Sequence, residues 1–205
     1  MNPVPVIHLV DDEPGLRKAL GRLLQAEGLC VRVHAGAEEF LAAYEPAELS
    51  CVILDVAMPG RGGLELQQHL AQCGTPPPIV FLTGHGDIPM SVRAIKAGAV
   101  DFLTKPVDDT ALLRAVRQAL AEAGRQAALR SEAGAWRARL RQLTPRELEV
   151  MAGVIAGRLN KQIAAQLGVQ EQTVKVHRGR VMEKMGVASV AELARGVERW
   201  GLVAG

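Results

Sequence analysis

The stretch CVILD, residues 51–55, decides the fold of this chain. Four apolar residues in succession, two of them β-branched, are typical of a strand that is buried on both faces of a sheet. VAMPG, residues 56–60, follows at once, and its proline and glycine end the extended backbone. The sequence therefore predicts that Asp55 stands as a lone carboxylate at the end of a buried strand.

The segments on either side alternate short β-branched runs with amphipathic stretches, from residue 4 to about residue 122. This alternation is typical of helices that cover both faces of a parallel sheet, so we predict five strand-helix units in a doubly wound α/β domain. The predicted strands are residues 6–10, 31–34, 51–55, 79–83 and 101–104, and the predicted helices are residues 14–27, 37–44, 64–73, 88–97 and 108–122.

The rest of the chain carries helix signals only. Residues 123–142 are rich in Ala, Arg and Gln and lack a strand signal, which predicts a linker, helical or, as the alternative, flexible. Thr144-Pro145-Arg146-Glu147 then has the pattern of a capping box with proline at the first helical position. Helices are expected up to Gly157, from a cap at Asn160 to 167, over 171–185, and from a second capping box at 189–192 to 200. We predict a first domain at residues 1–122 and a small all-α domain of four helices at 143–205.

Charge divides the chain in the same place. Residues 1–122 carry ten Lys and Arg against fifteen Asp and Glu, a net charge of −5, whereas residues 123–205 carry fourteen against seven, a net charge of +7. An acidic half joined to a basic half indicates two domains, the second with a polyanionic partner.

Cysteine content and hydropathy favour a cytoplasmic protein. Cys30, Cys51 and Cys73 are odd in number, lack metal-like spacing and each lie in an apolar context, so we expect reduced thiols in the core. No basic segment precedes an apolar stretch at the N-terminus, and no apolar run reaches the roughly 18 residues of a membrane span. We therefore expect no membrane partner.

Polar residues mark the carboxyl ends of four predicted strands: Asp11 and Asp12, Asp55, Thr83, and Lys105. Ligands of a doubly wound sheet bind at this edge. Gathered carboxylates repel one another, and Mg²⁺ relieves that repulsion with oxygen ligands while it accepts a phosphoryl oxygen. Lys105 then serves as a point charge and Thr83 as a hydroxyl donor for the other phosphoryl oxygens, with Asp55 as the nucleophile that forms an aspartyl phosphate. Each acid taken singly is explained as well by a turn or cap, and only the set favours a site.

Four motifs resemble the receiver domain of bacterial two-component response regulators: VDDE at 10–13, LDVAMPG at 54–60, LTGHGD at 82–87 and FLTKP at 102–106. The segment 83–106 most resembles the FixJ type. This resemblance implies a flavodoxin-like (βα)5 receiver with a five-stranded parallel sheet, and transfer of phosphate from a cognate sensor histidine kinase to Asp55. It also implies a switch in which Thr83 moves toward the phosphoryl group and Phe102 turns inward. We interpret His85 as a loop residue and not a ligand.

The same resemblance implies a Mg²⁺ site at the phosphorylation point. The ion is expected to be held by Asp12, Asp55 and the carbonyl of Ala57, and by Asp11 through water. Ala57 is a departure, since arginine is frequent there in this subgroup, and the control of phosphoryl lifetime that the longer side chain implies does not carry over to this chain. The glycine-rich segment 61–63 is expected to loosen the loop.

The predicted helix at 171–185 combines an apolar stripe with a basic face. Its inward residues are expected to be Val174, His177, Val181 and Met185, and its outward residues Lys175, Val176, Arg178, Gly179 and Met182, flanked by Arg180 and Lys184. A helix-turn-helix places its second helix in the major groove, with the helix start at base edges. Candidate DNA contacts are therefore Gln172 and Thr173 near the start, and Lys175, Arg178 and Arg180 at phosphates or guanines. A solvated basic face is the alternative.

The segment from LTPREL at 143–148 to MGV at 185–187 resembles a LuxR-type helix-turn-helix. The resemblance implies that Lys175 and Val176 contact DNA and that the last helix forms a dimer contact. Gly179 stands where the family commonly has a basic residue, so Arg178 or Arg180 is expected to replace that contact. Lys161, at the start of the preceding helix, is a candidate phosphate contact, with a solvated lysine as the alternative.

The whole chain is thus predicted to be a DNA-binding response regulator of a two-component system, an activator, and no enzyme beyond the phosphorylation and dephosphorylation of its own receiver. Phosphorylation of Asp55 is expected to promote homodimerisation and promoter binding. The expected partners are the sensor histidine kinase, double-stranded DNA and, as a further candidate, RNA polymerase. Two alternatives stay open: a phosphorelay or phosphate-sink protein, and a regulator that is never phosphorylated.

Overall fold

The computed structural model describes residues 4–74, 76–84 and 88–201. The chain divides into two compact units, Met1–Ala127 and Ala128–Gly205. Within the described ranges, none of the helices combines the length and the apolar character that crossing a bilayer requires.

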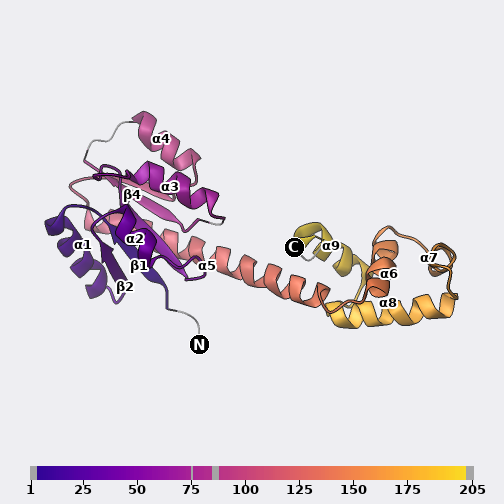
Figure 1. The fold of residues 1–205 in the computed structure, drawn as a ribbon. Coiled ribbons are helices and arrows are strands. Elements are labelled where there is room, and N and C mark those ends of the chain that lie inside the picture. Colours follow the sequence, from indigo (N-terminus) through magenta and orange to yellow (C-terminus); the bar gives the residue numbers. More distant parts are fainter. Residues whose placement is uncertain (1–3, 75, 85–87, 202–205) are drawn as a thin grey trace. The chain divides into compact units, whose positions relative to one another are not determined.

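The first unit is built on a five-stranded parallel sheet (Figure 1). Its strands are β1 (Val6–Val10), β2 (Cys30–His34), β3 (Ser50–Asp55), β4 (Ile79–Thr83) and β5 (Asp101–Thr104). They lie in the order β2-β1-β3-β4-β5, so the chain reverses its direction of winding between β1 and β3. The predicted doubly wound fold is confirmed, and each predicted strand matches the observed one to within a residue at either end.

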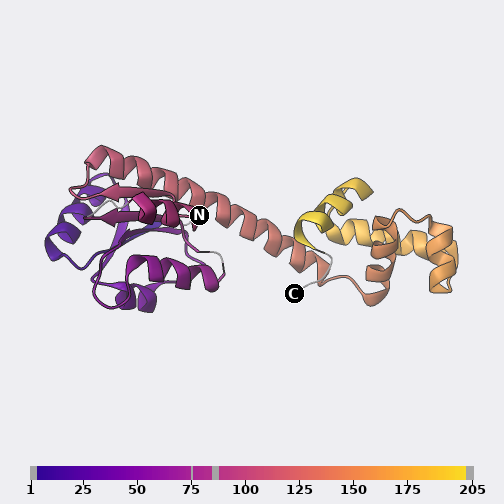
Figure 2. The same ribbon diagram turned by 90° about the horizontal axis from the view of Figure 1, so that it is seen from above.

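Helices cover both faces of this sheet (Figure 2). They are α1 (Pro14–Ala26), α2 (Ala37–Ala43), α3 (Gly63–Gln72), α4 (Ile88–Lys96) and α5 (Asp109–Leu140). Successive side chains of a strand point to opposite faces, so Ile53 packs with Leu24 of α1 and Leu112 of α5, whereas Leu54 packs with Phe40 of α2 and with α3. All of these side chains are fully buried, which stabilises the unit by about 1.5–3 kcal/mol each.

Helix α5 continues beyond the predicted end at residue 122 and runs to Leu140. Ala, Arg and Gln of this segment have high helix propensity, and the exposed Gly124 and Gly134 do not interrupt it. The end of the helix belongs to the second unit, where Trp136 and Leu140 are buried in the core. The Nε1–H of Trp136 donates a hydrogen bond of 3.0 Å to the carbonyl of Gly201.

The second unit contains four further helices, α6 (Pro145–Ile155), α7 (Asn160–Leu167), α8 (Glu171–Met185) and α9 (Val190–Trp200). The predicted capping box at the start of α6 is confirmed, because the Thr144 hydroxyl accepts from the Glu147 N–H and the Glu147 carboxylate accepts from the Thr144 N–H. Gly168 and Gly186 end α7 and α8 with φ of 65° and 62°, a left-handed conformation that favours glycine.

Two local predictions are wrong. Asn160 is not a helix cap: Leu159 precedes α7, and its N–H donates 2.8 Å to the side chain of Gln162. Only one of the three cysteines lies in a core, since Cys51 is buried whereas Cys30 and Cys73 are exposed. Cys30 starts an edge strand and Cys73 follows the end of α3, and neither position requires burial.

Candidate functional site

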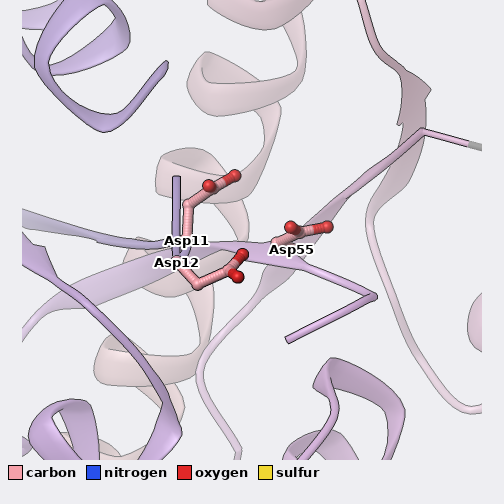
Figure 3. A group of neighbouring side chains, drawn as sticks. All are labelled: Asp11, Asp12 and Asp55. Atoms are coloured by element: carbon pink, nitrogen blue, oxygen red, sulfur yellow. The ribbon is translucent and has the colours of Figure 1, made fainter. Parts of the chain in front are cut away.

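Three carboxylates meet at the carboxyl end of the sheet (Figure 3). Val10 of β1 pairs with Leu54 of β3, so the residues that follow them, Asp11 and Asp55, lie side by side. With Asp12, each offers a carboxylate oxygen, and these oxygens all lie within 4.8 Å of one another. Asp11 and Asp55 are buried, whereas Asp12 is exposed. The structure thus brings Asp55 together with the adjacent pair Asp11 and Asp12, which is far from it in sequence but shares the same sheet edge.

Lys105 joins the two buried carboxylates. Its Nζ donates 2.8 Å to Oδ2 of Asp11 and 2.8 Å to Oδ2 of Asp55. The other oxygens of these carboxylates accept backbone N–H groups, that of Glu13 at 2.8 Å and that of Ala57 at 3.2 Å. Every oxygen of the buried pair therefore has a donor, which fixes the orientation of both side chains.

The charges around Lys105 determine its protonation. Burial lowers the pKa of Lys105, but the hydrogen bonds and negative charges of Asp11 and Asp55 outweigh this effect and raise the pKa above its usual value. The amine is therefore a permanent cation at neutral pH. Asp11, Asp12 and Asp55 carry three negative charges when ionised, and one ammonium leaves two of them uncompensated.

Thr83 lies on β4, the strand next to Asp55, and Phe102 lies on β5, the strand beyond it. Thr83 ends β4 with 3% of its surface exposed, and its carbonyl accepts the N–H of Lys105 at 2.7 Å. Phe102 on β5 is half-buried, with its ring centroid 6.0 Å from that of Phe81. Phe102 packs against the core of the first unit at its edge. His85, interpreted from the sequence as a loop residue, lies outside the described residues.

The glycine-rich loop after Asp55 is packed, which corrects the expectation that it is loosened. A Cβ on Gly63 would overlap the carbonyl oxygen of Asp55, and the Gly63 N–H donates 3.0 Å to the carbonyl of Val56. Glycine is needed here because the start of α3 approaches the backbone of the strand end so closely. The sequence pattern gave only the composition of the loop and not this contact.

Two residues that the sequence did not single out hold the backbone of Asp11. The guanidinium of Arg17 donates to the Asp11 carbonyl, and the Asp11 N–H donates 3.2 Å to the carbonyl of His34. Bonds between a side chain and a distant backbone group, or between two loops, leave no pattern in a single sequence. Spacing could not have indicated either residue.

The candidate DNA contacts mostly lie on the exposed side of α8. The exposed residues of α8 are Gln172, Thr173, Lys175, Val176, Gly179 and Arg180, and Lys161 on α7 is exposed too. Arg178 is half-buried, and its guanidinium donates 3.3 Å to the side-chain oxygen of Asn160, so it ties α8 to the start of α7. Met182 was expected to face outward, but it packs against the core of the second unit.

Lys184 is engaged inside the second unit. Its Nζ donates 2.7 Å to the carboxylate of Glu147 and 3.1 Å to the carbonyl of Gln142. The hydrogen bond from Lys184, then that from the backbone of Thr144, lowers the pKa of Glu147. This ion pair between the half-buried Lys184 and the buried Glu147 fixes α8 against the start of α6.

Known proteins resemble this chain over nearly all of its length. Residues 7–117 match the family described as "Response regulator receiver domain", and residues 141–197 match "Bacterial regulatory proteins, luxR family". The response regulator protein TmoT of Ectopseudomonas mendocina is 45% identical over 95% of this chain and 88% of its own. The transcriptional regulatory protein FixJ of Azorhizobium caulinodans is 44% identical over 92% of this chain and 90% of its own.

Solved structures give the same result. The response regulator StyR superposes with a TM-score of 0.85 at 42% identity and covers 96% of this chain and 99% of its own. Full-length FixJ from B. japonicum superposes with a TM-score of 0.58 at 39% identity, over 98% of this chain and 100% of its own.

Proposed function

This chain belongs to the two-component response regulators that join a receiver domain to a luxR-family DNA-binding domain, and we propose that Asp55 receives the phosphoryl group that controls it. As a member of this family the chain is a DNA-binding transcriptional regulator and not a metabolic enzyme. A sensor kinase and DNA are the partners that such a combination of domains implies. The luxR-family match makes a pure phosphate sink the weaker alternative.

The contact of Lys105 with both Asp11 and Asp55 is the observation that carries the assignment. It places a fixed cation beside a carboxylate at the end of a strand, where a phosphoryl group would bring new negative charge. A carboxylate oxygen of Asp55 attacks the phosphorus of the kinase phosphohistidine, the P–O bond forms, and the P–N bond breaks with its electron pair on the histidine nitrogen. Lys105 then donates to a phosphoryl oxygen.

A divalent cation fits the three carboxylates. Their oxygens are hard ligands, and two of their negative charges lack a compensating cation in the described site. We assign Mg²⁺ to Asp12, Asp55 and the Ala57 carbonyl, with Asp11 through water, because this ion needs few protein ligands beside a phosphoryl oxygen. Its chemistry there would be the neutralisation of charge on the transferred group. Asp11 and Lys105 hold Asp55 in place for the attack.

The response to phosphorylation is assigned to Thr83 and Phe102. Thr83 lies at the end of β4, next to Asp55, and its hydroxyl would bond a phosphoryl oxygen, while the half-buried Phe102 would turn inward on β5. The surface next to them is partly apolar, since Val92 and Ile95 of α4 are exposed to 45% and 46%. In this proposal, phosphorylation leads to a homodimer that forms through this face. The second domain of the dimer then binds DNA and recruits RNA polymerase.

For DNA contact we assign the exposed face of α8 and the start of α7. Lys175, Val176 and Arg180 would contact base edges or phosphates, with Gln172 and Thr173 near the helix start and Lys161 at a phosphate. Arg178, held by Asn160, would contribute mainly by keeping α8 in place. The domains are assigned to residues 1–122 and 143–205. Of the predicted linker 123–142, the later part packs with the second domain through Trp136 and Leu140.

The test is phosphorylation by acetyl phosphate with Mg²⁺, measured as the mass of the intact protein. Wild type is expected to gain one phosphoryl group and Asp55→Asn none. Glu65→Gln, which neutralises an exposed acid in the first turn of α3, is the matched control and should be labelled like wild type. Equal labelling of Asp55→Asn would contradict the assignment.

A further inference from the structure

An imidazole and a thiol lie side by side at the carboxyl end of α3. His69 belongs to the last turn of this helix, and Cys73 is the residue that follows its end. Nε2 of His69 lies 3.9 Å from Sγ of Cys73, and both residues are exposed. Because residues four positions apart are neighbours on a helix surface, α3 itself holds the two groups together. They form a pair of metal-ligand side chains on the surface of the first unit.

This pair is separate from the acidic site. Helix α3 begins at Gly63, whose backbone lies against the carbonyl of Asp55. The helix rises about 1.5 Å per residue, so the pair lies roughly 10–15 Å from that end. An ion at the pair and an ion at the carboxylates would therefore be two different ions with different ligands.

Burial divides α3 into two faces. Leu66, Gln67 and Leu70 are buried and hold the helix against the rest of the first unit. His69 and Cys73 belong to neither hydrophobic cluster of the described first unit. Free cysteine is among the residue types that are most often buried, so packing does not explain an exposed thiol beside an imidazole. Both groups are accessible to an ion from solution.

The two groups are ligands that Zn²⁺ prefers. A tetrahedral zinc ion binds an imidazole nitrogen at about 2.0 Å and a thiolate sulfur at about 2.3 Å, which separates these two atoms by roughly 3.6 Å. The 3.9 Å between Nε2 and Sγ differs from this value by only a few tenths of an ångström. Magnesium takes oxygen ligands instead, so it does not compete for this pair. The spacing therefore fits one zinc ion that is bound by both side chains.

The surroundings of the pair favour a cation. The last carbonyl groups of α3 carry the negative end of the helix dipole, which attracts positive charge. Glu65, one turn before His69, is exposed and adds a carboxylate to the same face of the helix. A dication is thus attracted to this end of α3.

We propose that His69 and Cys73 form a Zn²⁺ site in which Nε2 and the thiolate Sγ are two ligands and water supplies the others. On binding, the S–H bond of Cys73 breaks, its electron pair forms the Zn–S bond, and the proton passes to the solvent. The imidazole binds in its neutral form through the lone pair of Nε2. Because protons compete with zinc for both ligands, the affinity should rise with pH.

Alkylation of the cysteines in the full chain tests this site. The protein reacts with iodoacetamide at several Zn²⁺ concentrations in excess Mg²⁺, which occupies the carboxylates, and peptide masses show which thiol has reacted. With Zn²⁺ at about ten times its Kd, roughly one site in ten is free, so Cys73 should react about tenfold more slowly. Cys30, the other exposed thiol, is the internal control and should react at an unchanged rate. EDTA should restore the reaction of Cys73.

Two variants show whether the imidazole is a ligand. His69→Gln keeps a polar side chain at this exposed position but removes the nitrogen ligand, so the same Zn²⁺ concentration should no longer protect Cys73. Gln68→Ala, at an exposed position of the same turn, is the matched control and should keep the protection. Because both positions are exposed, both variants should unfold in urea like wild type.

Co²⁺ in place of Zn²⁺ gives a second measurement. A cobalt–thiolate bond absorbs in the near ultraviolet through charge transfer, whereas cobalt bound by carboxylates lacks this absorption. The absorption should appear in wild type and in Cys30→Ser, and it should be absent from Cys73→Ser.

Equal alkylation of Cys73 with and without Zn²⁺ would overturn the inference, as would protection that persists in His69→Gln. Protection of Cys30 to the same extent as Cys73 would also overturn it, because zinc would then bind any exposed thiol. So would a cobalt absorption that Cys73→Ser retains. None of these results depends on Asp55, so the function proposed for the acidic site would stand.

Discussion

Acidification should destabilise the first unit through two buried histidines. His8 of β1 and His34 of β2 have 0% and 4% of their surface exposed, and Nδ1 of His8 lies 3.0 Å from Nε2 of His34. One of these nitrogens must donate and the other accept, so the pair is stable only when the facing nitrogens share a single proton. Burial lowers the pKa of both histidines, and the charge of Arg32 adds to this. At His8 the hydrogen bond that Nε2–H donates to the carboxylate of Glu48 only partly opposes the effect.

The sign and size of the effect follow from linkage. Above the unfolded pKa of about 6.5 both histidines are neutral in the folded and unfolded states, and they contribute no pH dependence. Below that pH the unfolded chain binds protons that the folded chain does not, so the free energy of unfolding falls. The slope cannot exceed about 1.4 kcal/mol per pH unit for each histidine, so roughly 2.7 kcal/mol is the upper limit for the pair between about pH 7.5 and 5.5.

Urea unfolding followed by circular dichroism measures this loss at the two pH values. Trp136 and Trp200 both lie in the second unit, so their fluorescence gives a separate transition for that unit. Glu147 there has a lowered pKa, and the stability that it contributes is lost only as pH falls below its unfolded value of about 4.5. A first unit equally stable at both pH values would refute the reasoning.

Three substitutions test other contacts. Gly63→Ala should destabilise the first unit by roughly 1–3 kcal/mol in urea and slow labelling by acetyl phosphate, because the new methyl group overlaps the carbonyl of Asp55; unchanged labelling would contradict this. Lys184→Met should destabilise the second unit by about 2 kcal/mol in tryptophan fluorescence, because Glu147 is left without its partner; a stability equal to wild type would count against it. Gln67→Leu should lower the free energy of unfolding of the first unit by about 1–2 kcal/mol, because the buried amide of Gln67 donates hydrogen bonds of 3.3 Å to two carbonyls at the end of α4. The expected result is faster amide hydrogen exchange that is confined to this helix end.

The fold and the acidic site could be predicted because both depend on patterns along the chain. Short apolar runs predicted the strands. The polar residues that follow these runs predicted the site, because parallel strands bring their carboxyl ends to one edge of the sheet. Asp11 and Asp55 are 44 positions apart in the sequence, yet the strand pattern places both at the carboxyl edge of the sheet. The structure adds that β1 and β3 are neighbouring strands.

Features that depend on contacts between elements could not be predicted in this way. Helical spacing placed Met182 outside, but neighbouring helices extend the core far enough around α8 to cover it. Arg178 was counted as a free cation, although the start of α7 brings Asn160 within its reach. The continuation of α5 to Leu140 depends on Trp136, whose burial against α9 stabilises a segment that composition alone leaves undecided.

The central claim is that a phosphoryl group on Asp55 changes DNA binding by the second domain. Its most direct test is the affinity of the full chain for a duplex enriched from random sequences, with and without acetyl phosphate and Mg²⁺. Wild type should bind more tightly after phosphorylation, and Asp55→Asn should bind equally in both conditions. Equal stimulation of the two proteins, or none in a wild type whose mass shows the phosphoryl group, would contradict the account.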